Sequence, residues 1–137
     1  MSDDRAPRWE TKRYGTLRKV ALSLVILVLI AAHANALVII AQDGQYLGKA
    51  TTSTLDSDSF LNPYSPYGSK YSQTSIWNKY GTYGSAYGDY SAFSKYATKP
   101  PMLLDGAGMV AYITTNKHIK GGISPYGLVA LLHELGL

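Results

Sequence analysis

The stretch LVIIAQDGQYLGKATT, residues 37–52, contains a short apolar run, a turn signal and a second strand-like run, in that order. The turn signal is Asp43-Gly44, and the run that follows it contains a tyrosine and a leucine. Asp-Gly between two such runs favours a β-hairpin, because the tight primed turns need residues that tolerate a positive φ. The sequence therefore predicts a hairpin over residues 37–52.

A second stretch, MLLDGAGMVAYITTNK at residues 102–117, has the same layout. Its turn signal is Asp105-Gly106, and Gly108 offers a further position for a positive φ, so this turn can be wider. An isolated hairpin is only marginally stable in water. We therefore expect both hairpins to join one antiparallel sheet of about four strands.

The C-terminal segment predicts a helix over residues 124–135. Ser124 is a good N-cap, and Pro125 suits the first helical position. Leucines recur at helical spacing, at Leu128, Leu131, Leu132 and Leu135. Gly136 can end the helix. One apolar helix face on one sheet face gives a two-layer α+β domain, here a single domain over residues 37–137.

The segment between the predicted hairpins, residues 53–101, is rich in Tyr, Gly and Ser and contains a 16-residue repeat. NPYSPYGSKYSQTSIW, residues 62–77, is followed at once by NKYGTYGSAYGDYSAF, residues 78–93. Its tyrosines recur at spacings that a helix would also give. Pro66 and the repeated glycines oppose a helix, because both destabilise its interior. We therefore predict two or three similar turn-rich loops that rest on the sheet or on another molecule.

Residues 1–36 have the three-part layout of a secretory signal peptide. Basic residues stand close before the apolar run at residues 20–32, and the segment HANA then ends at Ala36 with small–x–small spacing. The alternative is an uncleaved anchor, in which residues 37–41 extend the apolar stretch. All four arginines precede the apolar run, so both interpretations export the rest of the chain to the periplasm, the cell surface or the medium.

Charge and cysteine content limit the partners of the exported part. Residues 37–137 hold seven lysines, no arginine and six acidic residues, a formal net charge of +1. Nucleic-acid binding needs clustered basic residues, so we expect no nucleic-acid partner, and membrane contact only through an uncleaved N-terminal segment. The chain has no cysteine, and the domain must therefore be stabilised by its core, by a ligand or by self-association.

Asp56 and Asp58, in the segment LDSDSF, are the candidate metal ligands. Calcium prefers carboxylate and other oxygen ligands, so a small-ligand or calcium-binding module is one hypothesis. The later positions of an EF-hand loop hold Phe60, Leu61 and Tyr67, which do not fit such a loop. The alternative is a polar turn in which Asp and Ser side chains bond to their own backbone.

The sequence offers no convincing catalytic group. His133 lacks the second histidine that a zinc-protease helix needs, because the sequence given stops too soon after it. None of the serines lies in a Gly-x-Ser-x-Gly turn. We therefore predict that the protein is not an enzyme and uses no cofactor; a hydrolase using a serine or His133 is the enzymatic alternative.

The aromatic residues of the repeat are the candidate binding surface. They are Tyr64, Tyr67, Tyr71, Trp77, Tyr80, Tyr83, Tyr87 and Phe93. Tyrosine offers a large flat face and a hydroxyl at low conformational cost, and Tyr/Ser/Gly mixtures recur at binding surfaces. The alternative, that these rings pack on one another as core, is compatible with some of them facing outward.

The phrases DGQYLG, NPYSPYGSKYS, TSIWNKYG and YATKPPMLL together resemble a group of small exported bacterial proteins with Asn-Pro-Tyr and Tyr-Gly-Ser repeats. The resemblance covers about residues 40–127 and implies export and this architecture. No activity is established for the group, so it implies no catalytic residue. The later repeats carry Lys79 and Lys95 where the pattern has proline, which makes those loops less rigid.

These features predict a non-enzymatic, exported interaction or structural protein of the bacterial envelope. Its repeat surface would contact an envelope protein, a glycan or another copy of the chain.

Overall fold

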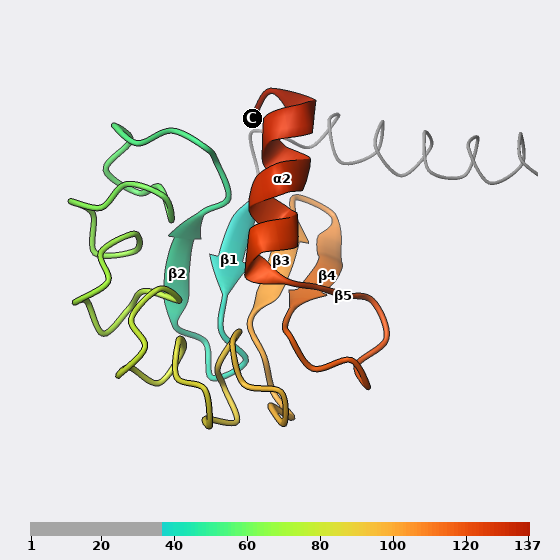
Figure 1. The fold of residues 1–137 in the computed structure, drawn as a ribbon. Coiled ribbons are helices and arrows are strands. Elements are labelled where there is room, and N and C mark those ends of the chain that lie inside the picture. The colour runs from blue at the N-terminus through green and yellow to red at the C-terminus, as the bar shows by residue number, and fades with distance from the viewer. Residues whose placement is uncertain (1–36) are drawn as a thin grey trace, which may run out of the picture. The chain divides into compact units, whose positions relative to one another are not determined.

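The computed structural model describes residues 37–137 (Figure 1). The signal peptide or anchor predicted over residues 1–36 lies outside the described residues. Within residues 37–137, no helix is long and apolar enough to cross a membrane.

A five-stranded sheet with one helix lying against it confirms the predicted α+β class (Figure 1). The spatial order of the strands is β2-β1-β3-β4-β5. Their bounds are β1 Val38–Ile40, β2 Tyr46–Lys49, β3 Met102–Asp105, β4 Gly108–Ile113 and β5 Gly122–Ile123. Helix α2 spans Pro125–Leu135. Strand β1 lies between β2 and β3 and pairs antiparallel with both.

The sheet differs from the expected four antiparallel strands by its fifth strand, β5, which pairs in parallel with β4 and makes the sheet mixed. Only two residues form β5, and the backbone pairing extends beyond it: Tyr112 N–H donates to Gly121 O at 3.0 Å. Two residues give no alternating pattern, so tertiary pairing, not local propensity, forms this strand.

Helix α2 is fixed at both ends by its capping residues. The Ser124 hydroxyl accepts a hydrogen bond from Gly127 N–H at 3.0 Å, and Gly136 ends the helix in the left-handed conformation with φ of +69°. Leu128 and Leu132 are fully buried. Each contributes about 1.5–3 kcal/mol by leaving water, which fastens the helix to the rest of the domain.

The repeat segment forms three successive coils of 16 residues without helix or strand. Coil 1 is residues 53–68, coil 2 is residues 69–84 and coil 3 is residues 85–100. Figure 1 shows them beside β2 and beneath the sheet, between the end of β2 and the start of β3. The repeat thus begins earlier than residue 62, where the identities are easiest to see.

Three polar positions of each coil close its turns, namely its first, seventh and tenth residues. Each side-chain oxygen accepts a hydrogen bond from the backbone N–H two residues later, at 2.9–3.3 Å. The three sets are Ser53, Ser69 and Ser85; Ser59, Ser75 and Ser91; and Asn62, Asn78 and Ser94. These local bonds replace the ladder that a strand or helix would provide.

The eighth residue of each coil is fully buried: Phe60, Ile76 and Ala92. The coils are also bonded to the sheet and its loops. In coil 1, Phe60 N–H donates to Lys49 O at 3.0 Å; in coil 3, Ala92 O accepts from Thr115 N–H at 3.0 Å. The first contact covers the outer edge of β2, because Lys49 also donates its N–H to Asp58 O at 2.7 Å.

Candidate binding groove

The coils carry two rows of exposed side chains, which are tyrosines except for one leucine. The third residues of the coils are Leu55, Tyr71 and Tyr87, and the twelfth residues are Tyr64, Tyr80 and Tyr96. All six side chains are 80–95% exposed. We call these rows the tyrosine stripes. Side chains exposed to this degree add little to the core, so folding does not explain why tyrosine recurs at these positions.

The tyrosines at the fifteenth coil position pack on the sheet instead. Tyr83 is only 8% exposed, and its hydroxyl donates to Asp43 Oδ2 at 2.7 Å. Burial, together with this hydrogen bond, raises the pKa of Tyr83 to about 12. Tyr67 is half-buried and meets Tyr46 edge to face, with ring centroids 5.0 Å apart.

Tyr67 and Tyr83 are therefore packing residues, which corrects their expected place in the binding surface. Gly48 of β2 makes this packing feasible, because a Cβ there would lie 2.6 Å from Tyr67 Cβ. Its φ of +108° also suits glycine alone. Some tyrosines of the repeat are therefore packed and others are exposed, and the position of each tyrosine in its coil decides which.

Four aromatic rings meet where coils 2 and 3 reach the start of α2. Trp77 lies 5.9 Å from Phe60, 5.7 Å from Phe93 and 5.6 Å from Tyr126, measured between ring centroids. Phe93 and Tyr126 are 5.8 Å apart. These separations are typical of favourable aromatic pairs. The Trp77 Nε1–H donates to Phe60 O at 2.7 Å, which fixes the orientation of the indole.

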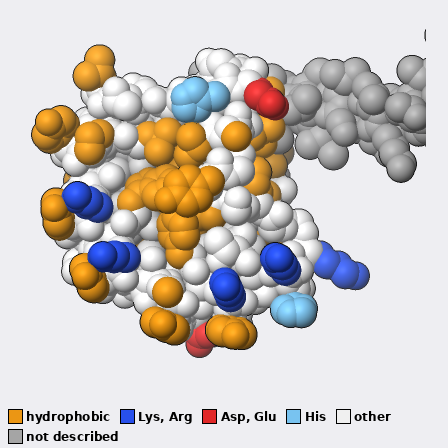
Figure 2. Space-filling model, in the orientation of Figure 1, with side chains coloured by type: hydrophobic (Ala, Val, Ile, Leu, Met, Phe, Trp, Pro, Cys, Tyr) orange, Lys and Arg blue, Asp and Glu red, His pale blue; other side chains and the backbone are white. Residues whose placement is uncertain are grey.

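An open groove of about 790 Å³ lies over this cluster, and we call it the aromatic groove. Its floor contains Trp77, Phe93 and Tyr126. Tyr80 and Tyr87, one from each tyrosine stripe, also line it. Figure 2 shows a continuous hydrophobic patch in the middle of this face, with separate hydrophobic side chains around it.

The charged side chain that lines the aromatic groove belongs to a lysine. Lys79 lines it and lies over the Tyr80 ring, 5.1 Å from the centroid. Among the described residues, no aspartate or glutamate lines this groove. Lysines gather on the lower part of the face in Figure 2. The arrangement can therefore hold a ligand that has flat apolar surfaces together with negative charge.

The groove brings together four of the predicted surface residues: Trp77, Tyr80, Tyr87 and Phe93. Tyr64 and Tyr71 are exposed on the tyrosine stripes but do not line it. Tyr126 was not predicted. Tyr126 lies in the predicted helix but outside the spacing of its leucines, so the sequence places it off the buried face. Its side chain is 70% exposed in the structure.

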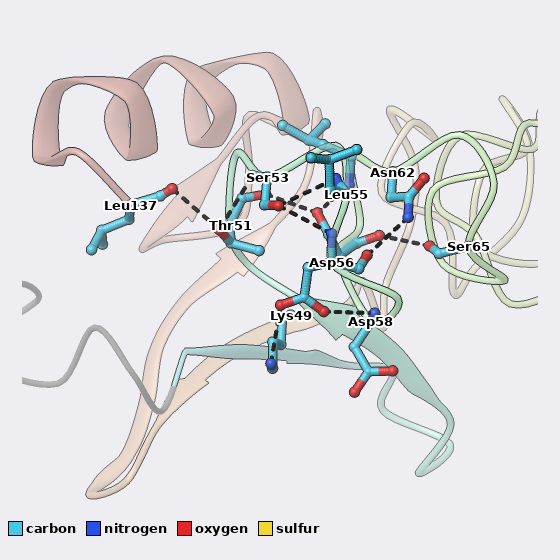
Figure 3. A network of polar contacts seen from close by, with 11 residues as sticks. Lys49, Thr51, Ser53, Leu55, Asp56, Asp58, Asn62, Ser65 and Leu137 are labelled. Atoms are coloured by element: carbon cyan, nitrogen blue, oxygen red, sulfur yellow. Dashed lines mark hydrogen bonds and ion pairs between the residues drawn. The ribbon is translucent and has the colours of Figure 1, made fainter.

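The carboxylate of Asp56 is bonded within the protein (Figure 3). Its Oδ2 lies 3.1 Å from Lys49 Nζ, and its Oδ1 accepts from Asp58 N–H at 2.9 Å. The backbone bond from Asp58 and then the lysine lower the pKa of Asp56. Nowhere in residues 37–137 do three or more His, Cys, Asp or Glu side chains gather as a metal site would need. The contacts match the polar-turn alternative.

His133, the candidate catalytic histidine, lies in the last turn of α2. Its Nδ1–H donates to Val129 O at 3.0 Å, within the same helix. This bond engages one ring nitrogen with the helix backbone, and it gives no support to the hydrolase alternative.

No protein-family model, no curated protein and no solved structure matches this chain.

Proposed function

We propose that the protein is a non-enzymatic, exported interaction protein of the bacterial envelope, and that its aromatic groove is the binding site. The observation that carries the proposal is the groove itself, where Trp77, Phe93 and Tyr126 form an aromatic floor beside two exposed tyrosines. Exposed aromatic patches on small domains mark contact sites, because they are otherwise unfavourable in water.

The layout of the repeat supports a binding role over a purely structural one. Buried residues of the coils already fasten them to the sheet, through the fully buried Phe60 and the bonded Tyr83. The exposed tyrosines are not needed to hold the coils on the sheet. Export is proposed from the N-terminal sequence alone, and the envelope setting follows from it.

The test compares two double variants of the full chain in the cell that produces it. Tyr87→Ala with Tyr126→Ala removes two exposed side chains of the groove, whereas Tyr64→Ala with Tyr71→Ala removes two exposed tyrosines outside it. We expect the groove variant to move from the envelope fraction to the soluble or medium fraction, and the control to stay. Immunoblots of fractionated cells measure both.

Thermal melting of each purified variant shows whether its fold is intact. If the groove variant melts like the wild type and stays in the envelope to the same extent, the proposed binding site is wrong.

A further inference from the structure

We propose that the aromatic groove binds a linear acidic polysaccharide, a sugar chain that carries carboxylates. This inference rests on the proposed function and specifies its ligand. Three features carry it: the ring faces of the floor, the lysines of the coils, and the spacing of the aromatic rings between neighbouring coils.

The Trp77 and Phe93 side chains of the floor offer a ligand flat ring faces and no hydrogen-bonding group. The Trp77 Nε1–H is already bonded to Phe60 O at 2.7 Å, so the indole presents only its flat surface to a ligand. Phe93 has no polar atom. A sugar ring has an apolar face of C–H groups that fits such a surface, while its edge of hydroxyls reaches the tyrosine hydroxyls of the rim.

The charge of the groove argues against a proline-rich peptide. Grooves that bind polyproline helices combine aromatic walls with donors for the carbonyl groups of the peptide. The indole N–H points into coil 1 and is not such a donor, and a proline-rich peptide without acidic residues does not complement the positive charge of Lys79. A strand-like peptide is disfavoured too, because coil 1 covers the edge of β2 through Lys49 and Ser59.

Lysines accompany the tyrosines from coil to coil. Lys79 and Lys95 occupy the eleventh position of coils 2 and 3, each directly before an exposed tyrosine. Lys70 lies over the Tyr71 ring at 5.2 Å, just as Lys79 lies over Tyr80. A chain lying across the coils therefore meets a repeated pair of one cation and one flat ring. A polymer with a carboxylate on its sugars matches both members of the pair.

The spacing of the rings also suits a repeating ligand. Trp77 and Phe93 hold the ninth position of neighbouring coils, and their centroids are 5.7 Å apart. Equivalent side chains thus recur on the scale of a single sugar ring. A linear polymer can engage successive coils with successive units, and the resulting multivalency strengthens otherwise weak contacts.

The experiment is affinity gel electrophoresis of the full chain through gels that contain one probe each. The acidic probes are polygalacturonate and alginate, the neutral ones dextran and amylose, and the other classes are represented by single-stranded poly(dT) and poly-L-proline. We expect the acidic polysaccharides to retard the protein, with a retardation that falls as salt is raised. Neutral polysaccharides should retard it at least tenfold less at equal mass.

Matched variants locate the site. Tyr87→Ala and Tyr126→Ala should each weaken binding by about tenfold, as exposed aromatic contacts at the centre of an interface do. Lys79→Gln should weaken it severalfold and flatten the salt dependence. Tyr64→Ala and Lys120→Gln, at exposed positions that neither line the groove nor form a lysine–tyrosine pair of the coils, should bind like the wild type. Circular dichroism and melting verify the fold of each variant.

Several results would overturn the inference. They are equal retardation by dextran, tighter binding of poly(dT) or poly-L-proline, no retardation by either acidic probe, or equal losses in Tyr64→Ala and Tyr87→Ala. If envelope retention depends on the groove while the acidic probes fail to bind, the proposed function survives and only the polysaccharide is excluded.

Discussion

The sheet and the coils solve the same problem, the pairing of buried backbone groups, in different ways. In the sheet, β1 exchanges backbone bonds with β2 and β3, and side chains are free to pack. In the coils, serine and asparagine oxygens take the backbone N–H groups, and the fully buried side chain at the eighth position of each coil supplies an apolar contact. The coils are thus specified by polar residues at fixed positions, which explains why their sequence resembles low-complexity filler.

The comparison also explains the tyrosines. Because Ser and Asn fix the coil backbone, the exposed tyrosines of the repeat are not needed for the core; they are Tyr64, Tyr71, Tyr80, Tyr87 and Tyr96. Tyr71 and Tyr87 can remain in solvent, where strand residues of similar size would be half-buried.

The largest expected effect comes from Phe60→Ala in coil 1. Phe60 is fully buried against the edge of the sheet, and its loss should lower the free energy of unfolding by about 3–5 kcal/mol. Phe60→Ile, which introduces the residue that coil 2 has at this position, should cost much less. Urea unfolding followed by circular dichroism measures both. Equal losses in the two variants would show that cavity size is not what matters here.

The next effect tests how closely the coils are wound. A Cβ at Gly84 would lie 2.3 Å from Asn78 O and 2.5 Å from Ile76 O, both backbone atoms. We expect Gly84→Ala to lower the free energy of unfolding by about 3 kcal/mol through overpacking. Gly88→Ala is the control, because its nearest contact would be 3.3 Å away. A melting temperature for Gly84→Ala equal to that of Gly88→Ala would contradict this winding.

A smaller expected loss of stability distinguishes the two hydrogen bonds that the Asn78 side chain makes. Asn78 Oδ1 accepts from Tyr80 N–H at 3.1 Å, and its Nδ2 donates to Ser72 O at 3.0 Å. Asn78→Ala should cost about 1–3 kcal/mol, because buried backbone groups lose their partners. Asn78→Ser copies coil 3, where Ser94 keeps only the first bond, and should cost about half as much. Stability curves in which alanine and serine behave alike would show that the backbone pairs in another way.

The smallest effect concerns the contact between a coil and the sheet. Tyr83→Phe removes the bond to Asp43 and should cost about 1 kcal/mol at neutral pH. The pKa of Tyr83 is about 12 in the folded protein against an ordinary value of 10.0. The unfolded chain therefore loses this proton first, and stability falls as the pH rises from about 10 to about 12.

The variant should lack this part of the alkaline decline, whereas Tyr64→Phe, with an exposed side chain, should keep it. Urea unfolding at pH 9, 10 and 11 tests the difference. Parallel pH curves for wild type and Tyr83→Phe would rule out a role for this hydroxyl.

The sequence predicts what local chemistry determines. Asp-Gly signals, the Ser124-Pro125 start of the helix and the leucine spacing were enough for the α+β class. Strand β5 was missed because its two residues pair only through tertiary contacts. The repeat identified the aromatic candidates, but a 16-residue period is not that of a helix or a strand, so the sequence alone did not show which coil positions face solvent.

The aromatic groove could not be predicted from the sequence either, because tertiary contacts form it. Tyr126 contacts Trp77 and Phe93 because α2 begins beside coils 2 and 3. No local sequence pattern predicts this tertiary contact.

The strand order gives the coils one further meaning. Strands β2 and β3 are both antiparallel to β1, and so they run parallel to each other. A chain that joins parallel strands must travel back along the sheet, a crossover that an α-helix usually makes. Here the three coils make that return. The coils therefore take the place that a crossover helix has in other parallel connections, between the end of β2 and the start of β3.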